Sequence, residues 1–232
     1  MTHARAEELR LRLAAVRERI GRACEQAGRD PAGVTLVVVT KTYPASDVRL
    51  LAELGVADVA ENRDQEASAK AAACADLGLR WHFVGQLQTN KARSVARYAS
   101  CVHSVDRPAL VRSLGRAAGA REAPLDCLVQ VSLDGDTTRG GTPVGELDTV
   151  AEAIVREPGL RLRGIMAVAP LGIDPRRAFS VLPGLLEGLR SRHGTADVLS
   201  AGMSGDLEAA ILTGATHLRV GTAVLGRRVI TG

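Results

Sequence analysis

The sequence alternates short apolar runs with helical segments eight times after its first 30 residues, and this alternation restricts the fold more than any other feature. Strands that alternate with helices over short connections form a parallel sheet. The runs are rich in Val, Leu and Ile without regular polar positions, as strands buried on both faces are. The predicted strands cover residues 34–40, 57–60, 81–85, 100–104, 126–133, 161–168, 196–200 and 216–220.

The segments between these runs have the apolar spacing of amphipathic helices. One more helix is predicted before the first strand, because Leu9, Leu13 and Val16 recur at helical spacing within residues 4–27. The turn-rich segment 134–146 is predicted to be a loop after the fifth strand. The other predicted helices cover residues 45–54, 63–77, 88–98, 107–119, 144–156, 174–191, 204–213 and 222–226.

Eight strand–helix units favour an α/β fold of the (β/α)8 TIM barrel type, which typically takes about 250 residues. The alternative is an open, doubly wound sheet. Its nucleotide-binding motifs are missing, since no GxGxxG follows the first predicted strand and GxxxxGK[ST] does not occur. We therefore expect one domain over residues 1–232, with an extra N-terminal helix over 1–28 and the barrel over 34–226.

Composition excludes several classes of partner. Aromatic residues make up 2% of the chain, too few to stack on bases, and the formal net charge of +4 is spread without a dense basic stretch. We expect neither a nucleic acid nor a membrane as partner. The charged N-terminus has no apolar signal segment, which predicts a cytoplasmic protein. The cysteines lack CxxC spacing and are predicted to be small core residues: Cys24, Cys74, Cys101 and Cys127.

Only three of the 30 basic residues are lysines, namely Lys41, Lys70 and Lys91. Arginine stays protonated and forms no Schiff base, whereas a desolvated lysine can lose its proton and attack a carbonyl carbon. Lys41 directly follows the first predicted strand, and a TIM barrel carries its active site at the carboxyl ends of its strands. Lys41 is therefore the candidate reactive lysine, with chance as the other explanation for its retention.

Glycine-containing turns follow the last two predicted strands. The seventh strand ends in SAGMSGD (200–206), where Ser204 is expected at a helix N-cap, and the eighth ends in RVGTAVLG (219–226), where Gly221 and Thr222 open a short helix. Free N–H groups at such helix starts bind anions, and TIM barrels often bind phosphate there. Ordinary capping explains either turn alone. The two turns together predict a phosphate site.

A lysine and a phosphate site at one barrel mouth predict pyridoxal 5'-phosphate (PLP) as the cofactor. We expect an aldimine between PLP and Lys41, with the phosphate bound by Ser204, Gly221 and Thr222. Arg219 lies two residues before Gly221, hence on the same face of the strand, where it can reach the pyridine nitrogen. An arginine leaves that nitrogen unprotonated, so the ring is a weaker electron sink. Aminotransferase chemistry is therefore disfavoured.

Six sequence blocks between residues 34 and 226 carry a further signal: VVVTKTYPASDVRLLAELG, VADVAENRDQEASAK, WHFVGQLQTNK, HSVDR, RLRGIMAVAP and SAGMSGDLEAAILTGATHLRVGTAVLG. In combination they resemble the pyridoxal phosphate homeostasis protein family. That family is similar to the barrel domain of bacterial alanine racemase and lacks the second, β-rich domain that supplies the racemase's catalytic tyrosine.

The resemblance implies a cofactor role for seven residues. It adds Asn62 and Met203, which would line the ring, to the residues already inferred. Family members are described as PLP carriers or regulators of vitamin B6 and amino-acid balance without established turnover. The resemblance thus implies a non-catalytic protein, monomeric or weakly dimeric, whose partners are PLP and apo PLP-enzymes. The implied PLP-binding residues are Lys41, Asn62, Met203, Ser204, Arg219, Gly221 and Thr222.

The sequence departs from the family pattern at two positions. Where the family usually has a lysine before the glycine of the loop after strand five, this chain has Arg139 before Gly140. A second lysine able to accept PLP would therefore be missing, because arginine forms no aldimine. Ala60 also replaces the glycine of the family's GENR block, which we expect to be tolerated unless that position needs a positive φ.

The remaining ionisable residues are predicted to be structural. His82 and His103 lie within apolar strands and are expected to be hydrogen-bonded core residues. None of the five histidines is expected in a ligand cluster, so no metal site is predicted. Lys70 and Lys91 lie on predicted helices, where solvated ion pairs are expected.

Two other functions stay open from the sequence. An amino-acid racemase or decarboxylase of the alanine racemase type needs an acid or base on each side of the substrate α-carbon. Tyr43 and Tyr98 are the only tyrosines, and Glu61 and Asp106 are the acids considered, although structural pairing is expected for both acids. The other possibility is a barrel that binds a different phosphorylated metabolite without PLP.

Overall fold

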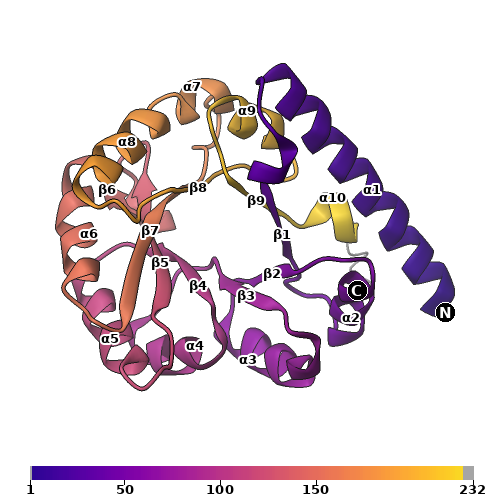
Figure 1. Cartoon of the computed structure of the whole chain (residues 1–232), viewed down its shortest axis with the longest axis horizontal. Coiled ribbons are helices and arrows are strands. Elements are labelled where there is room, and N and C mark those ends of the chain that lie inside the picture. The colour runs from indigo at the N-terminus through magenta and orange to yellow at the C-terminus, as the bar shows by residue number, and fades with distance from the viewer. Residues whose placement is uncertain (1, 227–232) are drawn as a thin grey trace.

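The predicted barrel is present in the computed structural model, which describes residues 2–226 (Figure 1). Eight parallel strands pair in the order β4-β3-β2-β1-β9-β8-β7-β5, and pairing of β4 with β5 closes the ring. A short β6 (Thr142–Pro143) is added beside β5. The barrel strands are β1 (Thr35–Val39), β2 (Asp58–Glu61), β3 (Arg80–Phe83), β4 (Cys101–Val105), β5 (Leu125–Ser132), β7 (Leu160–Ala167), β8 (Val198–Ser200) and β9 (His217–Val220).

Each barrel strand lies within two residues of its predicted bounds, because buried β-branched runs are unambiguous between helical segments. The closed ring excludes the open, doubly wound sheet. Helices form the outer layer in Figure 1. They are α2 (Ala45–Glu53), α3 (Asp64–Ala73), α4 (Ala92–Tyr98), α5 (Pro108–Ala118), α6 (Leu147–Val155), α7 (Pro175–Phe179), α8 (Leu182–Arg192), α9 (Leu207–Leu212) and α10 (Thr222–Leu225).

Five helix predictions were wrong in detail. In three of them a 3-10 turn replaces one end of the predicted helix, since α3 ends at Ala73, α4 begins at Ala92 and α6 begins at Leu147. The single helix predicted over 174–191 is two helices, because α7 ends where the Ser180 hydroxyl bonds to the Arg177 carbonyl and α8 starts with Pro183 in its first turn. The helix predicted from residue 204 begins at Leu207 instead. The predicted loop 134–146 contains a 3-10 turn at Thr137–Arg139.

The extra N-terminal helix, α1 (Thr2–Gln26), packs along the outside of the barrel against α2, α9 and α10 (Figure 1). Its predicted apolar stripe faces the barrel, and Leu9, Leu13 and Val16 are at most 2% exposed. Burial of each such side chain contributes about 1.5–3 kcal/mol. Arg5 fixes the helix further, because it donates to Asp47 on α2 and to the Leu225 carbonyl on α10.

The four cysteines are buried free thiols, as predicted from their spacing. Within residues 2–226, no helix combines the length and apolar character needed to cross a membrane.

Lys70 is buried, which contradicts the predicted solvated ion pair. Its Nζ lies 2.6 Å from Glu61 Oε1 and donates to the Thr40 carbonyl at 2.8 Å. The Thr40 hydroxyl also donates to Glu61 Oε1, at 2.6 Å. Helical spacing alone does not reveal this pair, because α3 carries Lys70 on the face that covers β1 and β2. The pair fixes the end of β1 immediately before Lys41.

Replacement of Lys70 by Met tests this pair. The variant leaves the Glu61 carboxylate buried without its cation, so we expect a loss of about 3–5 kcal/mol in the free energy of unfolding. The double change Lys70→Met with Glu61→Leu removes both charges and should recover most of that loss. Urea unfolding monitored by circular dichroism measures both. The exposed-lysine control Lys91→Met should change stability by less than about 0.5 kcal/mol, and an equally small effect of Lys70→Met would contradict the assignment.

Candidate functional site

A cavity of about 440 Å³ opens at the carboxyl ends of the barrel strands, a volume within the usual range for small-molecule sites. All seven residues predicted from the sequence lie in its wall, although they come from four strand ends. Its lining consists of Val39, Lys41, Asn62, Val84, Gly85, Gln86, Gln130, Arg139, Met166, Val168, Met203, Ser204, Gly205, Arg219, Gly221 and Thr222. A second hollow between α3 and α4 lies on the outer surface, away from the strand ends.

Lys41 leaves β1 through a constrained turn. Thr42, the next residue, has φ +68°, and it is the one non-glycine residue with positive φ among residues 2–226. A left-handed β-branched residue costs about 1–3 kcal/mol. The Thr42 N–H donates to Glu66 Oε2 and the Tyr43 N–H donates to the Thr40 carbonyl, which hold the turn. The turn leaves Lys41 exposed at the mouth of the cavity.

Ser204 lines the cavity, but its hydroxyl does not make the predicted N-cap contact. Asp206 is the residue before α9, and the Ser204 hydroxyl instead accepts the N–H of Ala223 in the first turn of α10, at 3.1 Å. Gly202 makes the turn possible, because its φ is +91° and a Cβ there would lie 2.6 Å from the Ala210 Cβ. Ser204, Gly221 and Thr222 therefore form one edge of the cavity.

Arg219 is a buried cation in the cavity floor. Its side chain projects inside the barrel from β9 and is fixed by two bonds, from Nη1 to the Ser200 hydroxyl at 2.6 Å and from Nη2 to the Ala167 carbonyl at 2.9 Å. The residue is 5% exposed. Burial lowers the pKa of Arg219 to about 10, which still leaves the guanidinium protonated at neutral pH. The floor thus presents a fixed positive charge.

The two departures from the family pattern have clear structural settings. Arg139 reaches the cavity wall and pairs with Asp134 and Asp136 in its own loop. Ala60 does not have a positive φ and is fully buried in β2, so its Cβ is tolerated.

The sequence-based predictions missed Gln130 and Met166, which line the cavity from β5 and β7. Gln130 is a polar residue inside an otherwise apolar run, and this exception to the pattern could have marked it as a residue of the site. Neither tyrosine lines the cavity. The Tyr43 hydroxyl donates to the Gly226 carbonyl at 2.8 Å, and the Tyr98 hydroxyl donates to Asp64 at 3.4 Å. Of the acids considered, Glu61 is paired with Lys70 and Asp106 with Arg107, as expected.

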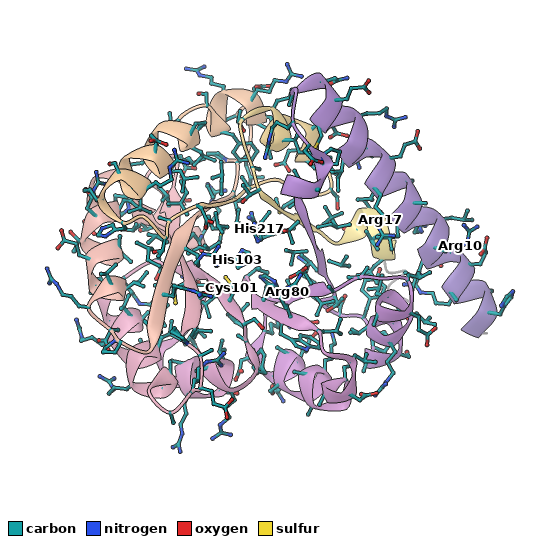
Figure 2. The ribbon with its side chains drawn as sticks, viewed as in Figure 1. Arg10, Arg17, Arg80, Cys101, His103 and His217 are labelled. Carbon is teal, nitrogen blue, oxygen red and sulfur yellow. The ribbon has the colours of Figure 1, made fainter. Side chains whose placement is uncertain are left out.

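The prediction that none of the five histidines lies in a ligand cluster missed a group of close contacts inside the barrel. The rings of His82, His103 and His217 lie close together inside the barrel, and His103, His217 and Cys101 are seen near its centre in Figure 2. His82 Nδ1 lies 2.8 Å from His103 Nε2, and the ligand atoms of His82, His103 and Cys101 all lie within 4.8 Å of one another. Barrel closure brings together strands that are distant in sequence. Both strand histidines are nevertheless hydrogen-bonded core residues, as predicted.

Burial makes two of these histidines weak bases. It is the main cause that lowers the pKa of His217 to about 4, and it lowers the pKa of His103 well below the ordinary value. Asp58, behind His82, behaves differently. Burial would raise its pKa, but hydrogen bonds from His82 and Arg80 outweigh burial and lower the pKa to about 2.

Comparisons with known proteins agree on one family. Residues 11–229 match the family described as alanine racemase, N-terminal domain. A relative from Corynebacterium glutamicum named pyridoxal phosphate homeostasis protein is 44% identical over 217 residues, which cover 90% of this chain and 97% of the relative. The chain belongs to the pyridoxal phosphate homeostasis protein family. The family match begins at residue 11, so it includes much of α1 beyond the 34–226 seen in the motifs.

Solved structures of similar proteins have the same barrel fold. PipY of Synechococcus elongatus, solved with PLP bound, is 33% identical with a TM-score of 0.82, covering 94% of this chain and all of PipY. Alanine racemase from Corynebacterium glutamicum is 15% identical with a TM-score of 0.67, covering all of this chain and 62% of the racemase. At this low identity, the similarity to alanine racemase shows only a shared fold.

The buried histidines should make the protein less stable in mild acid. In the unfolded chain His217 is protonated below its ordinary pKa of about 6.5, whereas in the folded chain it is protonated only below a pKa of about 4. The free energy of unfolding therefore falls as the pH falls from about 6.5 to about 4. At pH near 5 the cost from His217 is about 2 kcal/mol. Urea unfolding near pH 7.5 and pH 5 should show that His217→Gln loses less stability than the wild type. Equal losses would show that burial does not keep His217 neutral in the folded chain.

Proposed function

We propose that the protein binds PLP in the cavity at the barrel mouth, holds it on Lys41, and serves PLP and amino-acid homeostasis as a carrier without turnover. The observation that supports this most directly is the shared cavity wall, in which Lys41 and the buried Arg219 accompany the Ser204 edge. Relatives named for PLP homeostasis and the PLP-bound PipY structure support the choice of cofactor.

The residues of the cavity suit the three parts of the cofactor. The unprotonated Lys41 amine would condense with the aldehyde to a Schiff base as water leaves, a bond that hydrolysis reverses. The Ser204 hydroxyl and the N–H groups of Gly221 and Thr222 would bind the phosphate. A Cβ at Gly221 would lie 3.1 Å from the Val39 carbonyl oxygen, a tight contact that glycine avoids.

Asn62 and Met203 would flank the ring, and Arg219 would contact its pyridine nitrogen. When bound, PLP supplies an electron sink whose strength depends on the charge at that nitrogen. Because Arg219 is a cation that donates hydrogen bonds, it would keep the nitrogen unprotonated and the sink weak. This arrangement favours storage of the cofactor over chemistry on an amino acid.

The racemase or decarboxylase alternative is less well supported. Proton transfer on the second face of a substrate needs an acid at the cavity. In the described part of the chain, both tyrosines are engaged outside the cavity and Glu61 is paired with Lys70. The relatives are named as homeostasis proteins.

Lys41 is exposed at an open mouth, a position from which a covalently held cofactor could pass to another protein. Apo PLP-enzymes are accordingly the partners that the carrier role requires. We place this role in the cytoplasm, where such enzymes are made, and we propose that the chain acts as a single barrel domain, monomeric or weakly dimeric.

The covalent anchor is tested by substitution of each accessible lysine. Wild-type protein incubated with PLP should develop a visible Schiff-base absorbance, and borohydride reduction followed by peptide mass mapping should place the label on Lys41. Lys41→Ala should lose the band, while Lys91→Ala, the exposed-lysine control, should keep it. A label on Lys91, or no band with wild type, would contradict the proposal. Phosphate-ligand binding that survives in Lys41→Ala without any PLP band in wild type would instead favour the barrel for another phosphorylated metabolite.

The loop arginine offers a gain-of-function test. Since Arg139 lines the same cavity, Arg139→Lys places a second primary amine within its wall. We expect borohydride trapping in this variant to label the introduced amine in addition to Lys41, at a lower yield because Asp134 and Asp136 keep that amine protonated. Labelling confined to Lys41 would show that this loop does not meet the bound cofactor.

A further inference from the structure

A row of hydrogen bonds crosses the barrel interior from the cavity floor toward the amino-terminal face. Arg219 Nη1 lies 2.6 Å from Ser200 Oγ, which lies 2.9 Å from His103 Nδ1. His103 Nε2 lies 2.8 Å from His82 Nδ1, and His82 Nε2 lies 3.0 Å from Asp58 Oδ1. None of these five residues is more than 6% exposed. The row links residues on five different strands.

The chemistry of the two ends gives the row a direction. Arg219 only donates hydrogen bonds, and the ionised Asp58 carboxylate only accepts them. His82 Nε2 must therefore donate to Asp58, which leaves Nδ1 of a neutral His82 to accept from His103 Nε2. The remaining His103 nitrogen, Nδ1, then accepts from the Ser200 hydroxyl, which accepts from Arg219. Each donor and acceptor has one consistent role, and aligned bonds of this kind strengthen one another.

Arg80 makes a neutral His82 the consistent choice. Its guanidinium binds both carboxylate oxygens of Asp58, at 2.7 Å and 2.5 Å, so the negative charge of Asp58 is already balanced. The Arg80 side chain is 60% exposed, at the opposite end of the barrel from the cavity. Figure 2 shows Arg80 and His103 within the ring of strands.

A metal site is the competing explanation for His82, His103 and Cys101. Two nitrogens bound at 2.0–2.1 Å to one tetrahedral ion must lie about 3.3 Å apart. The observed 2.8 Å between His82 Nδ1 and His103 Nε2 is instead a hydrogen bond. The geometry therefore favours the hydrogen-bonded row.

We propose that Ser200, His103 and His82 are positioning residues that hold Arg219 against the cofactor ring through this one-way row, with Asp58 as its anchor. The inference rests on the proposed function because that function supplies the bound PLP, whereas the row of hydrogen bonds consists of protein side chains only. Without the row, Ser200 would be free to rotate, and Arg219 would keep only its bond to Ala167. The pyridine nitrogen of PLP would then meet a less fixed cation. Residues toward the barrel face opposite the cavity would thus determine how firmly Arg219 is held beside the cofactor ring.

The direction of the row is tested without cofactor by nitrogen-15 NMR of the histidine rings near neutral pH. We expect His82 and His103 each to carry a proton on Nε2 and none on Nδ1. A His82 ring protonated on both nitrogens, or a proton on His103 Nδ1, would reverse the row and overturn the assignment. Uptake of one Zn²⁺ per chain that is lost in Cys101→Ala would overturn it in favour of a metal site.

The effect on Arg219 is tested by PLP titration and absorbance of variants. His103→Leu removes one donor and one acceptor, and we expect about a tenfold weaker affinity for PLP and a shifted visible band. His103→Gln keeps one of each and should stay within about threefold of wild type. His217→Leu is the matched control, because His217 lies in the same interior but bonds to Thr216 outside the row.

These outcomes separate the two proposals. Equal affinity and band position in wild type and His103→Leu would overturn the positioning role while leaving PLP binding intact. If His217→Leu moved the band as much as His103→Leu, general repacking would be the cause and the role would be rejected. A wild-type protein that binds no PLP would contradict the proposed function itself, and the ring protonation states would still decide the row.

Discussion

Pairing of β4 with β5 is the contact on which the remaining structure depends, because it turns a row of parallel strands into a ring. In the open order, these two strands would lie at the far ends of the sheet. Closure removes both unpaired edges and brings every strand end to one mouth. Within the ring, β1 lies beside β9 with Val37 opposite Arg219, so the lysine that follows β1 and the arginine of β9 share one cavity.

The strands and their covering helices also bury polar side chains, and this burial explains how those side chains are connected. An unpaired charge inside a protein is costly, and a buried pair is tolerated only when its partners are complete. Lys70 and Glu61 are joined through Glu61 Oε1 to each other and to Thr40, which directly precedes Lys41, whereas Glu61 Oε2 has no hydrogen-bond partner among the described residues. Arg219 meets this demand at the cavity floor with Ser200 and Ala167. The interior that supports the mouth is therefore hydrogen-bonded as well as apolar, which restricts how its side chains move.

The cavity combines features that suit retention of a cofactor with features that limit chemistry. The proposed anchor, Lys41, is exposed after a strand end that is followed by the constrained turn at Thr42, while the cation at the floor is buried and fixed. The tyrosines are bonded elsewhere. Under the proposed function, a reversible covalent bond at this open mouth, with a weak electron sink beneath it, would suit holding PLP and releasing it to a partner.

Much of this protein followed from local sequence patterns. The eight strands were predicted within two residues because their apolar runs are short and bounded. Five of the seven residues proposed to bind the cofactor were named from their places at strand ends, whereas Asn62 and Met203 were added by the family resemblance. The break near Ser180 was missed because helical spacing continues across it. Ser204 was placed near the phosphate edge for the wrong reason, since its partner is Ala223, almost twenty residues later.

The interior contacts were decided by tertiary structure alone. Lys70 has the surroundings of a surface residue in the sequence, yet α3 turns it toward Glu61. His82 and His103 are 21 residues apart on the paired strands β3 and β4, and Ser200 follows His103 by 97 residues, so no local sequence pattern relates the three. The sequence by itself determined which segments become strands and helices, because hydrophobic period and turn residues act over a few positions. Which buried polar groups meet depends on strand order and register, which only the closed barrel sets.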